Sequence, residues 1–307
     1  MKRPKHPDPR YKALVIACCV LGLFLFQTGK ASAAMPPSPS VQKHPTPAKN
    51  PHSVVLNTAC QEMTNLLLIG QDRRDGEARA RSDCMILCTF QPDEGRLTMT
   101  SFLRDLYVEI PGHGHNRLNA AYAIGGTELL SKTLTHNFGV TIDGCVEADF
   151  TQFPKLIDTL GGIQITLRQD EADHINAHTS GPALQEGTQW LTGEQALAYS
   201  RIRTLDDDGD FSRTGRQRAI LTTLFQRFRN TNLPELMALF RNCADMLSTD
   251  MPKRELLALA MGICPSLSHL EITSKQIPAE GTYRYQMINN MSVLVADINR
   301  NRTLLQE

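Results

Sequence analysis

Charged residues gather in one stretch of this chain, GEQALAYSRIRTLDDDGDFSRTGRQRAI, between Gly193 and Ile220. The stretch contains five arginines and four aspartates, although the whole chain carries 32 basic and 32 acidic residues and no net charge. Arginine suits bidentate capture of phosphate oxygens, and aspartate supplies hard oxygen ligands to Mg²⁺. Because no chain-wide field favours an ionic partner, we expect local chemistry on an anionic ligand with a divalent cation.

Two arginines in this stretch are spaced to act as a pair. If the chain leaves the helix expected at 193–200 in extended form, Arg201 and Arg203 point the same way and Ile202 points the opposite way. Two guanidiniums on one face can clamp an anion. Taken alone, each also fits a solvated surface residue in an ion pair worth under about 1 kcal/mol, and the run Asp206–Asp208 reads as a solvated loop.

The helix expected at 210–229 changes character along one face. Its first two turns place three polar residues within an arc of about 60°; they are Asp210, Arg213 and Gln217. The same stripe then turns apolar and continues with Ile220, Leu221, Leu224 and Phe228. Charges on a core-facing stripe are costly unless they line a site. We therefore expect the polar turns to face a ligand, while the apolar turns fit plain core packing.

Three short apolar runs, at 65–70, 83–90 and 96–102, predict strands, and the turn Gln91–Gly95 joins the second to the third. An antiparallel meander of these strands brings the end of the first, the start of the second and the end of the third to one sheet edge. The charged residues at those points are Asp72, Arg81, Asp83, Arg104 and Asp105. We expect them to converge on one rim, where open α/β sheets usually bind ligands.

Strands and helices alternate along the rest of the chain, which predicts a single α/β domain over 54–307, three layers thick, with helices on both faces of the sheet. Further strands are expected at 145–150, 163–168 and 270–273. Further helices are expected at 116–124, 127–137, 151–160, 233–247, 253–263 and 290–300.

The N-terminal part predicts export. A basic tail at 1–12 precedes the uncharged apolar segment 13–29, which is close to the lower limit of about 17 residues for spanning a bilayer. The positive-inside rule then places the tail in the cytoplasm and the folded domain outside. The A-x-A pattern ending at Ala33 leaves open that the segment is a cleaved signal and the protein is secreted. Residues 30–53, rich in Pro and Ser, read as an extracellular tether.

Six cysteines follow the apolar segment: Cys60, Cys84, Cys88, Cys145, Cys243 and Cys264. Their spacing matches no zinc pattern. The even spacing of Cys84 and Cys88 in a strand predicts small buried core residues, although an exported domain also permits disulfides.

Several blocks resemble the LytR-CpsA-Psr family, and they occur in the same order: NLLLIGQD, RSDCMIL, TSFLRDLYVEIPGHGHNRLNAAYAIGG, IDTLGGIQI, GTQWLTGEQALAYSRIR and DFSRTGRQRAIL. The resemblance implies a mixed sheet flanked by helices, with an apolar tunnel for an isoprenoid chain. It also implies a membrane-anchored phosphotransferase that moves a glycopolymer from a polyprenyl-pyrophosphate lipid to peptidoglycan, through a phosphodiester, during cell-wall assembly. Two departures are Leu103, where the family often has proline, and Cys145, where an aromatic residue is common.

The resemblance also assigns roles to single residues. It implies Mg²⁺ ligands at Asp72 and Asp83. The implied pyrophosphate-binding residues are Arg81, Arg201, Arg203, Arg213 and Gln217. Arg104 and Asp105 match the family's Arg-Asp pair, with Asp105 as the candidate for acid-base work; Arg201 and Arg203 would stabilise charge in the transition state. The apolar stripe described above becomes a candidate wall of the lipid tunnel.

Three other functions stay open. Water in place of the sugar hydroxyl would make the protein a pyrophosphatase on the same lipid-linked substrate. A transcriptional attenuator is a second alternative, but the sequence has no helix-turn-helix signature or basic stripe and the domain is expected outside the cell, so we expect no nucleic-acid partner. A glycan-binding module without catalysis is the third, and such a module would tolerate loss of Asp72 and Asp83.

Overall fold

A six-stranded mixed β-sheet, with the strand order β10-β3-β2-β1-β6-β9, forms the centre of the structure. The computed structural model describes residues 63–71, 82–149, 151–206, 209–230, 247–251 and 269–306. The strands of the sheet are β1 (Thr64–Gln71), β2 (Ser82–Gln91), β3 (Arg96–Phe102), β6 (Gly144–Asp149), β9 (Leu247–Thr249) and β10 (Glu271–Ile277).

The expected antiparallel meander of β1, β2 and β3 is confirmed. A single 3-10 turn, Pro92–Glu94, joins β2 to β3. The sheet is mixed because β6 runs parallel to β1 and β10 runs parallel to β3. Alternate side chains of each strand face opposite sides, so Leu67 belongs to one core cluster and Leu66 to another.

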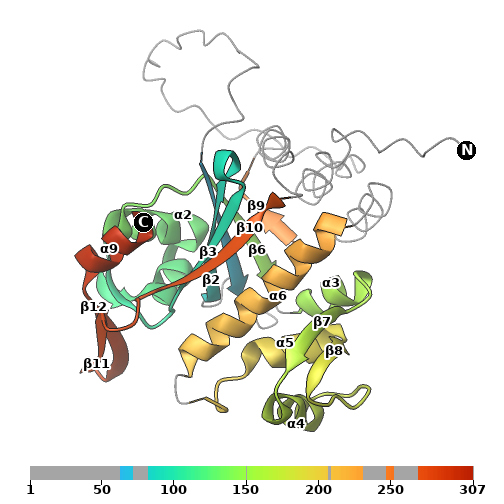
Figure 1. Ribbon diagram of the computed structural model, residues 1–307. Coiled ribbons are helices and arrows are strands. Elements are labelled where there is room, and N and C mark those ends of the chain that lie inside the picture. Colours follow the sequence, from blue (N-terminus) through green and yellow to red (C-terminus); the bar gives the residue numbers. More distant parts are fainter. Residues whose placement is uncertain are drawn as a thin grey trace, which may run out of the picture.

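Helices cover both faces of this sheet, as expected (Figure 1). On one face, α2 (Leu118–Phe138) and α9 (Ile298–Gln306) enclose the larger core with Leu67, Met85 and Phe102 of the strands. The two helices expected at 116–124 and 127–137 are confirmed as the two parts of α2, which are separated at the non-helical Gly126 (φ 66°, ψ −154°). A positive φ of this size is open to glycine but strained for other residues.

The opposite face is covered by α6 (Asp210–Asn230), which lies against β3 and β10. A second small core lies on the far side of α6 (Figure 1). It is built by α3 (Phe153–Thr159), β7 (Ile163–Leu167), α4 (Gln169–His178), β8 (Gly187–Leu191) and α5 (Gly193–Arg201). The strand expected at 163–168 is therefore present, but it pairs with β8 in a separate hairpin rather than joining the central sheet.

Two further hairpins extend from the face covered by α2. They are β4 (Tyr107–Ile110) with β5 (Gly114–Arg117), and β11 (Tyr283–Ile288) with β12 (Met291–Ala296). The helix expected at 290–300 is wrong, because 291–296 is strand and the helix begins only at Ile298. Asn289 and Asn290 have φ of 50° and 60°, the left-handed pair that a two-residue hairpin turn requires.

Part of the expected organisation lies outside the described residues. This holds for the segments 1–12, 13–29 and 30–53 and for the helix at 253–263. Most of the helix expected at 233–247 lies outside too, and its last residue belongs to β9. Within the part of the chain that the structure describes, no helix is long and apolar enough to cross a membrane.

Candidate active site

The expected rim of charges forms at the edge where β2 begins and β3 ends. Arg104, which follows β3, donates from Nη1 to Oδ1 of Asp83 over 2.7 Å, and its Nε lies 3.7 Å from Oδ2 of Asp105. Asp72 and Arg81 fall outside the described residues. Three of the five residues predicted at this edge are therefore brought together, and the other two stay predictions.

The arginine pair at the end of α5 shows the expected alternation in exposure, although Arg201 is the last residue of the helix and the chain becomes extended only at Ile202. Ile202 caps the helix with φ −57° and ψ 128° and lies in the small core at 1% exposure, whereas Arg201 and Arg203 on either side are exposed. The buried isoleucine fixes the chain, so both guanidiniums face outward from the same turn. Arg203 reaches from here to Asp210, the first residue of α6.

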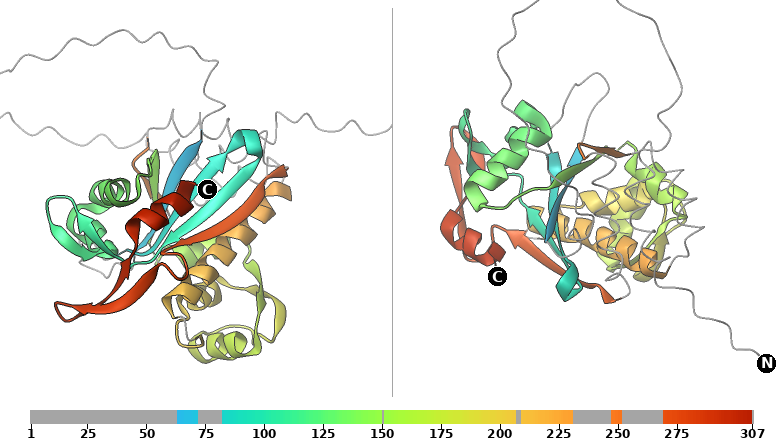
Figure 2. Two further views of the ribbon diagram at one scale, coloured as in Figure 1. Left: turned by 60° about the vertical axis from the view of Figure 1, so that its left-hand side comes forward. Right: turned by 90° about the horizontal axis from the view of Figure 1, so that it is seen from above.

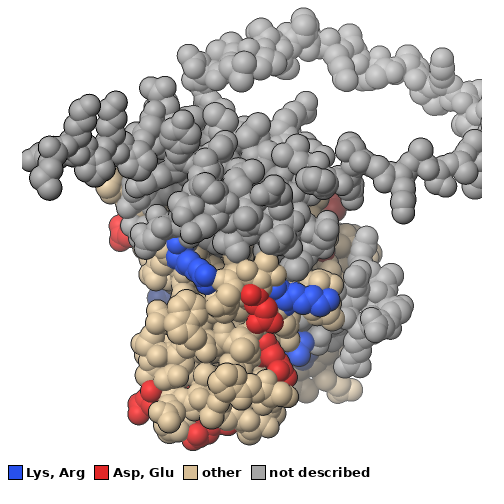
Figure 3. Space-filling model, turned by 90° about the vertical axis from the view of Figure 1, so that its right-hand side faces the viewer, with Lys and Arg blue, Asp and Glu red and all other residues tan. Residues whose placement is uncertain are grey.

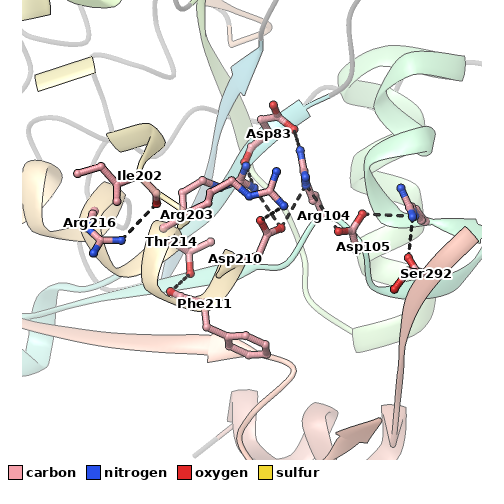
Figure 4. Close-up of polar contacts among 12 residues, drawn as sticks. Asp83, Arg104, Asp105, Ile202, Arg203, Asp210, Phe211, Thr214, Arg216 and Ser292 are labelled. Carbon is pink, nitrogen blue, oxygen red and sulfur yellow. Dashed lines mark hydrogen bonds and ion pairs between the residues drawn. The ribbon is translucent and has the colours of Figure 1, made fainter. Parts of the chain in front are cut away.

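Asp210 joins the two halves of the site, and we call it the hub carboxylate. It lies 3.1 Å from Nε of Arg104, 2.9 Å from Nη2 of Arg203 and 3.2 Å from Nη2 of Arg213. These three guanidiniums come from the end of β3, the α5–α6 loop and α6 itself, and Figure 4 shows Arg104 and Arg203 converging on the hub. Segments more than a hundred residues apart thus build one cationic cluster around a single acidic group.

Burial makes this cluster a place where charge interactions are strong. The side chain of Arg213 is 6% exposed and that of the hub carboxylate 11%. Burial lowers the pKa of Arg213. Burial also acts to lower the pKa of Arg104, but Asp210 and Asp83 outweigh it and raise that pKa overall. Arginine stays protonated in either case. By contrast, the face of the molecule shown in Figure 3 carries scattered charges between wide uncharged areas.

Besides Oδ1 of Asp210, two buried polar atoms in the first turns of α6 have no hydrogen-bond partner among the described residues: Nε of Arg213 and Oε1 of Gln217. Both residues lie on the stripe that the helical spacing predicted, and both are under 9% exposed. Buried polar atoms are normally satisfied by protein, water or ligand. Nε of Arg213, whose guanidinium contacts the hub carboxylate, can donate a hydrogen bond to water or a ligand, and Oε1 of Gln217 can accept one.

Sequence reasoning missed Arg117, at the end of β5. Its Nε lies 3.3 Å from Oδ1 of Asp105, and its Nη2 donates to the carbonyl oxygen of Ser292 in β12 over 2.6 Å. Asp105 is thus held between Arg104 and Arg117, yet its Oδ1 accepts no hydrogen bond from the described residues. The sequence signal was the position of Arg117, within the block that begins at Thr100, but its partner in β12 is distant in sequence.

Arg216 was also missed, and its role is to position the arginine loop. Its side chain, 5% exposed, lies 2.8 Å from Oε1 of Glu171 in α4, pairs with Asp206 and donates to the carbonyl oxygen of Ile202 over 3.2 Å. Asp206 also pairs with Arg168 at 2.9 Å. This first residue of the run Asp206–Asp208, which was expected to be a solvated loop, therefore forms ion pairs. Arg216 therefore ties the loop that carries Arg203 to α4 and α6.

A third arginine of α6, Arg218, lies between the helix and the sheet. Its Nη1 donates to Oγ of Ser101 over 2.6 Å and to Oγ1 of Thr214 over 3.4 Å, and burial lowers its pKa. Within the described residues it forms no ion pair with a carboxylate. The sequence pattern did not single it out, because it falls off the stripe that carries Arg213 and Gln217.

Comparison with known proteins establishes the family of the chain. The sequence model of the LytR_cpsA_psr family matches residues 26–307. The chain belongs to this family. It is 32% identical over 236 residues to the polyisoprenyl-teichoic acid–peptidoglycan teichoic acid transferase TagT of Bacillus subtilis, covering 73% of this chain and 71% of that protein. It is 31% identical over 245 residues to the regulatory protein MsrR of Staphylococcus aureus, covering 77% and 71%.

The fold of this LytR_cpsA_psr family member matches a solved structure as well. Bacillus subtilis TagT with bound octaprenyl pyrophosphate lipid superposes with a TM-score of 0.62 at 28% identity, covering 81% of this chain and 90% of that one. The mixed sheet with helices on both faces is thus the family fold.

The apolar residues of α6 divide between two cores. Ile220 and Leu224 are buried in the small core beyond α6, whereas Leu221 packs toward the sheet against the cluster that contains Ile86. The side chain of Phe228 lies outside the described part of the structure. Core packing thus accounts for Ile220 and Leu224, and a lipid-facing role for the stripe stays a prediction.

The donor chemistry at the edge of the sheet fits a magnesium ion. Asp83 is 25% exposed and Arg104 engages its Oδ1, which leaves Oδ2 without an ion-pair partner among the described residues. Mg²⁺ typically takes one or two carboxylates and completes its shell with water and phosphate oxygens. The described residues contain no group of three or more Asp, Glu, His or Cys side chains that could hold a metal ion. Asp72, the second expected ligand, lies outside the described residues.

The three cysteines that the structure describes lie in or against the core. Cys88 and Cys145 are buried at 1% exposure and Cys84 is half-buried, which confirms the expected core role of Cys84 and Cys88. All three are free thiols, and burial raises the pKa of each to about 12. Cys60, Cys243 and Cys264 lie outside the described residues.

Proposed function

We propose that this protein is a phosphotransferase that moves a glycopolymer from a polyprenyl-pyrophosphate lipid to peptidoglycan and leaves a phosphodiester link. The observation that carries the proposal is the convergence of Arg104, Arg203 and Arg213 on one buried carboxylate. Such a cluster can hold a diphosphate whose charge the guanidiniums neutralise. The names of TagT, a teichoic acid transferase, and of its octaprenyl-pyrophosphate complex support the same substrate class.

Phosphoryl transfer depends mainly on positioning and charge stabilisation. A sugar hydroxyl of the acceptor attacks the phosphorus that carries the glycopolymer. The new O–P bond forms as the bridging P–O bond to the lipid phosphate breaks, and the lipid phosphate leaves with the electron pair. Arg203 and Arg213 stabilise the charge that builds on the phosphate oxygens. Arg201, exposed beside Arg203, Arg81 and Gln217 complete the proposed diphosphate site.

Asp105 is our candidate for the group that accepts the hydroxyl proton. Its side chain lies between two guanidiniums and is 24% exposed, so part of the carboxylate can be reached from solvent. A carboxylate oxygen with an open lone pair can bind the attacking hydroxyl and take its proton as the O–P bond forms. Arg104 fixes the carboxylate in place by contacts to Asp83 and Asp210 as well as to Asp105 itself.

Mg²⁺ is part of the proposal, with Asp83 and Asp72 as its protein ligands. When bound, the ion would neutralise phosphate charge and orient phosphate oxygens. We further propose that residues 13–29 hold the chain in the membrane, with 54–307 outside the cell. In that arrangement the lipid substrate and the peptidoglycan acceptor are on the same side as the site.

The test is product analysis. The full-length protein is incubated with a polyprenyl-pyrophosphate oligosaccharide, Mg²⁺ and a peptidoglycan glycan acceptor. The products are then identified by mass spectrometry. We expect an acceptor carrying the oligosaccharide through one phosphate. Release of oligosaccharide phosphate alone, with acceptor present, would identify a pyrophosphatase instead, and no consumption of the lipid would overturn both activities.

Asp83→Asn sharpens this test. We expect it to lower turnover about 100-fold or more, because it removes a carboxylate that both fixes Arg104 and is proposed to bind Mg²⁺. The Mg²⁺ concentration for half-maximal activity should rise with it. Asp93→Asn, an exposed carboxylate in the turn between β2 and β3, is the matched control and should leave both values unchanged.

A further inference from the structure

The β11–β12 hairpin carries large side chains into solvent. Tyr285 is 65% exposed and Met287 66%, and together with Tyr283 they lie on one face of β11, since alternate residues of a strand share a face. Figure 2 shows the hairpin projecting beyond the sheet and its helices. Exposed aromatic and sulfur-containing side chains on a projecting element are characteristic of binding surfaces.

The rings on this face form a row that starts at the candidate active site. Phe211, the neighbour of the hub carboxylate, stacks on Tyr283 with ring centroids 4.9 Å apart, and Tyr283 meets Tyr285 edge to face at 5.9 Å. Phe211 is buried and Tyr283 partly buried, so the inner rings are fixed by packing. Tyr285 is consequently held on a rigid base, with most of its ring open to solvent.

The hairpin also contacts Asp105, the residue proposed to take the proton of the acceptor hydroxyl. The backbone N–H of Leu294 donates to the carbonyl oxygen of Asp105 over 2.9 Å, and Arg117 bridges Asp105 and Ser292. Figure 4 shows the charged groups running from Arg203 through the hub carboxylate to Asp105 and Ser292. The hairpin thus lies at the Asp105 end of the site, away from Arg203.

The direction of the reaction selects one occupant for this surface. Attacking and leaving oxygens lie roughly in line on opposite sides of the transferred phosphorus. The attacking hydroxyl must be near the proton acceptor, so a glycan that supplies it extends from the Asp105 end. The apolar face of a sugar ring stacks on an aromatic ring, and tyrosine adds a polar edge suited to a wet surface.

We propose that Tyr285, supported by Tyr283, is a sugar-stacking platform that binds the acceptor glycan and delivers its hydroxyl to Asp105. This inference rests on the proposed transferase function and adds to it the subsite for the second substrate. The platform is neutral, as the ring face of a peptidoglycan sugar requires. The donor lipid and its diphosphate are held by other residues.

The test is steady-state kinetics of the full-length chain, with the acceptor glycan varied at saturating donor and the donor varied at saturating acceptor. Tyr285→Ala should raise the acceptor KM about three- to tenfold, the effect expected for losing one ring contact. The donor KM should not change. Tyr285→Phe, which keeps the ring, should restore the acceptor KM to near its original value. Gln286→Ala, an exposed residue on the opposite face of the same strand, is the matched control.

The contradicting results are distinct. An acceptor KM for Tyr285→Ala within twofold of the unaltered chain, while that chain makes the phosphodiester product, overturns the platform and leaves the transferase standing. A rise in donor KM alone would place the donor glycan on the hairpin, and weaker sedimentation with anionic phospholipid vesicles at unchanged acceptor KM would make it a lipid contact; each overturns the inference. Absence of any transfer product from the unaltered chain overturns both.

Discussion

Arg203→Ala should separate catalysis from stability. The Arg203 side chain is 43% exposed and makes one ion pair among the described residues, at 2.9 Å to the hub carboxylate. An ion pair this exposed contributes about 1 kcal/mol or less to the free energy of unfolding, so the melting temperature should fall by no more than about 4 °C. A guanidinium that stabilises transition-state charge is worth about 2.7–4 kcal/mol, which predicts a 10²- to 10³-fold loss of kcat/KM.

Arg96→Ala is the matched control for this change. Arg96 is 39% exposed and pairs with Glu94 at 2.9 Å, so exposure and ion-pair distance nearly equal those of Arg203, but it lies at the other end of β3. The assay compares kcat/KM for phosphodiester formation and thermal unfolding in the two variants. Our reasoning fails if both variants lose activity to the same small extent, or if Arg203→Ala loses activity only because it unfolds.

Two further predictions concern buried groups. Arg216→Ala should lower the free energy of unfolding by about 3–5 kcal/mol in chemical denaturation, because it leaves the carboxylate of Glu171, 6% exposed, without its closest cation; an effect below 1 kcal/mol would contradict this. Burial raises the pKa of Cys88 from 9.0 to about 12, so its contribution to stability is complete below pH 9 and is lost as the pH rises toward 12. Between pH 8 and pH 10 the free energy of unfolding of the unaltered protein should fall by about 1 kcal/mol more than that of Cys88→Ala. The same fall in both proteins over this pH range would refute the prediction.

The sequence predicted the parts of the fold whose signals are local. The meander followed from three apolar runs and the turn at Gln91–Gly95, and it placed Asp83 beside Arg104 without any other structural information. The exposure pattern around Ile202 likewise followed from the alternation of side chains in extended chain. Each of these inferences needed only the period of the element and the position of a turn.

What sequence reasoning missed depends on weak local patterns or on long-range contacts. The run YRYQMINNMSVLVA was read as ending in a helix because the paired asparagines at 289–290 were not recognised as a hairpin turn. The α4 helix is polar over most of its length, so it lacks the apolar stripe that marks a helix. Arg117 and Arg216 have partners in β12 and α4, and only the folded chain shows these pairs.

A crystal structure of the protein with a polyprenyl pyrophosphate and Mg²⁺ would test the central claim most directly, namely that guanidiniums from distant segments surround one diphosphate. We predict diphosphate oxygens within about 3 Å of the guanidiniums of Arg104, Arg203 and Arg213, with the contacts of Arg203 and Arg213 to Asp210 lengthened or broken. A diphosphate bound elsewhere, with all three arginines still paired to Asp210, would contradict the account.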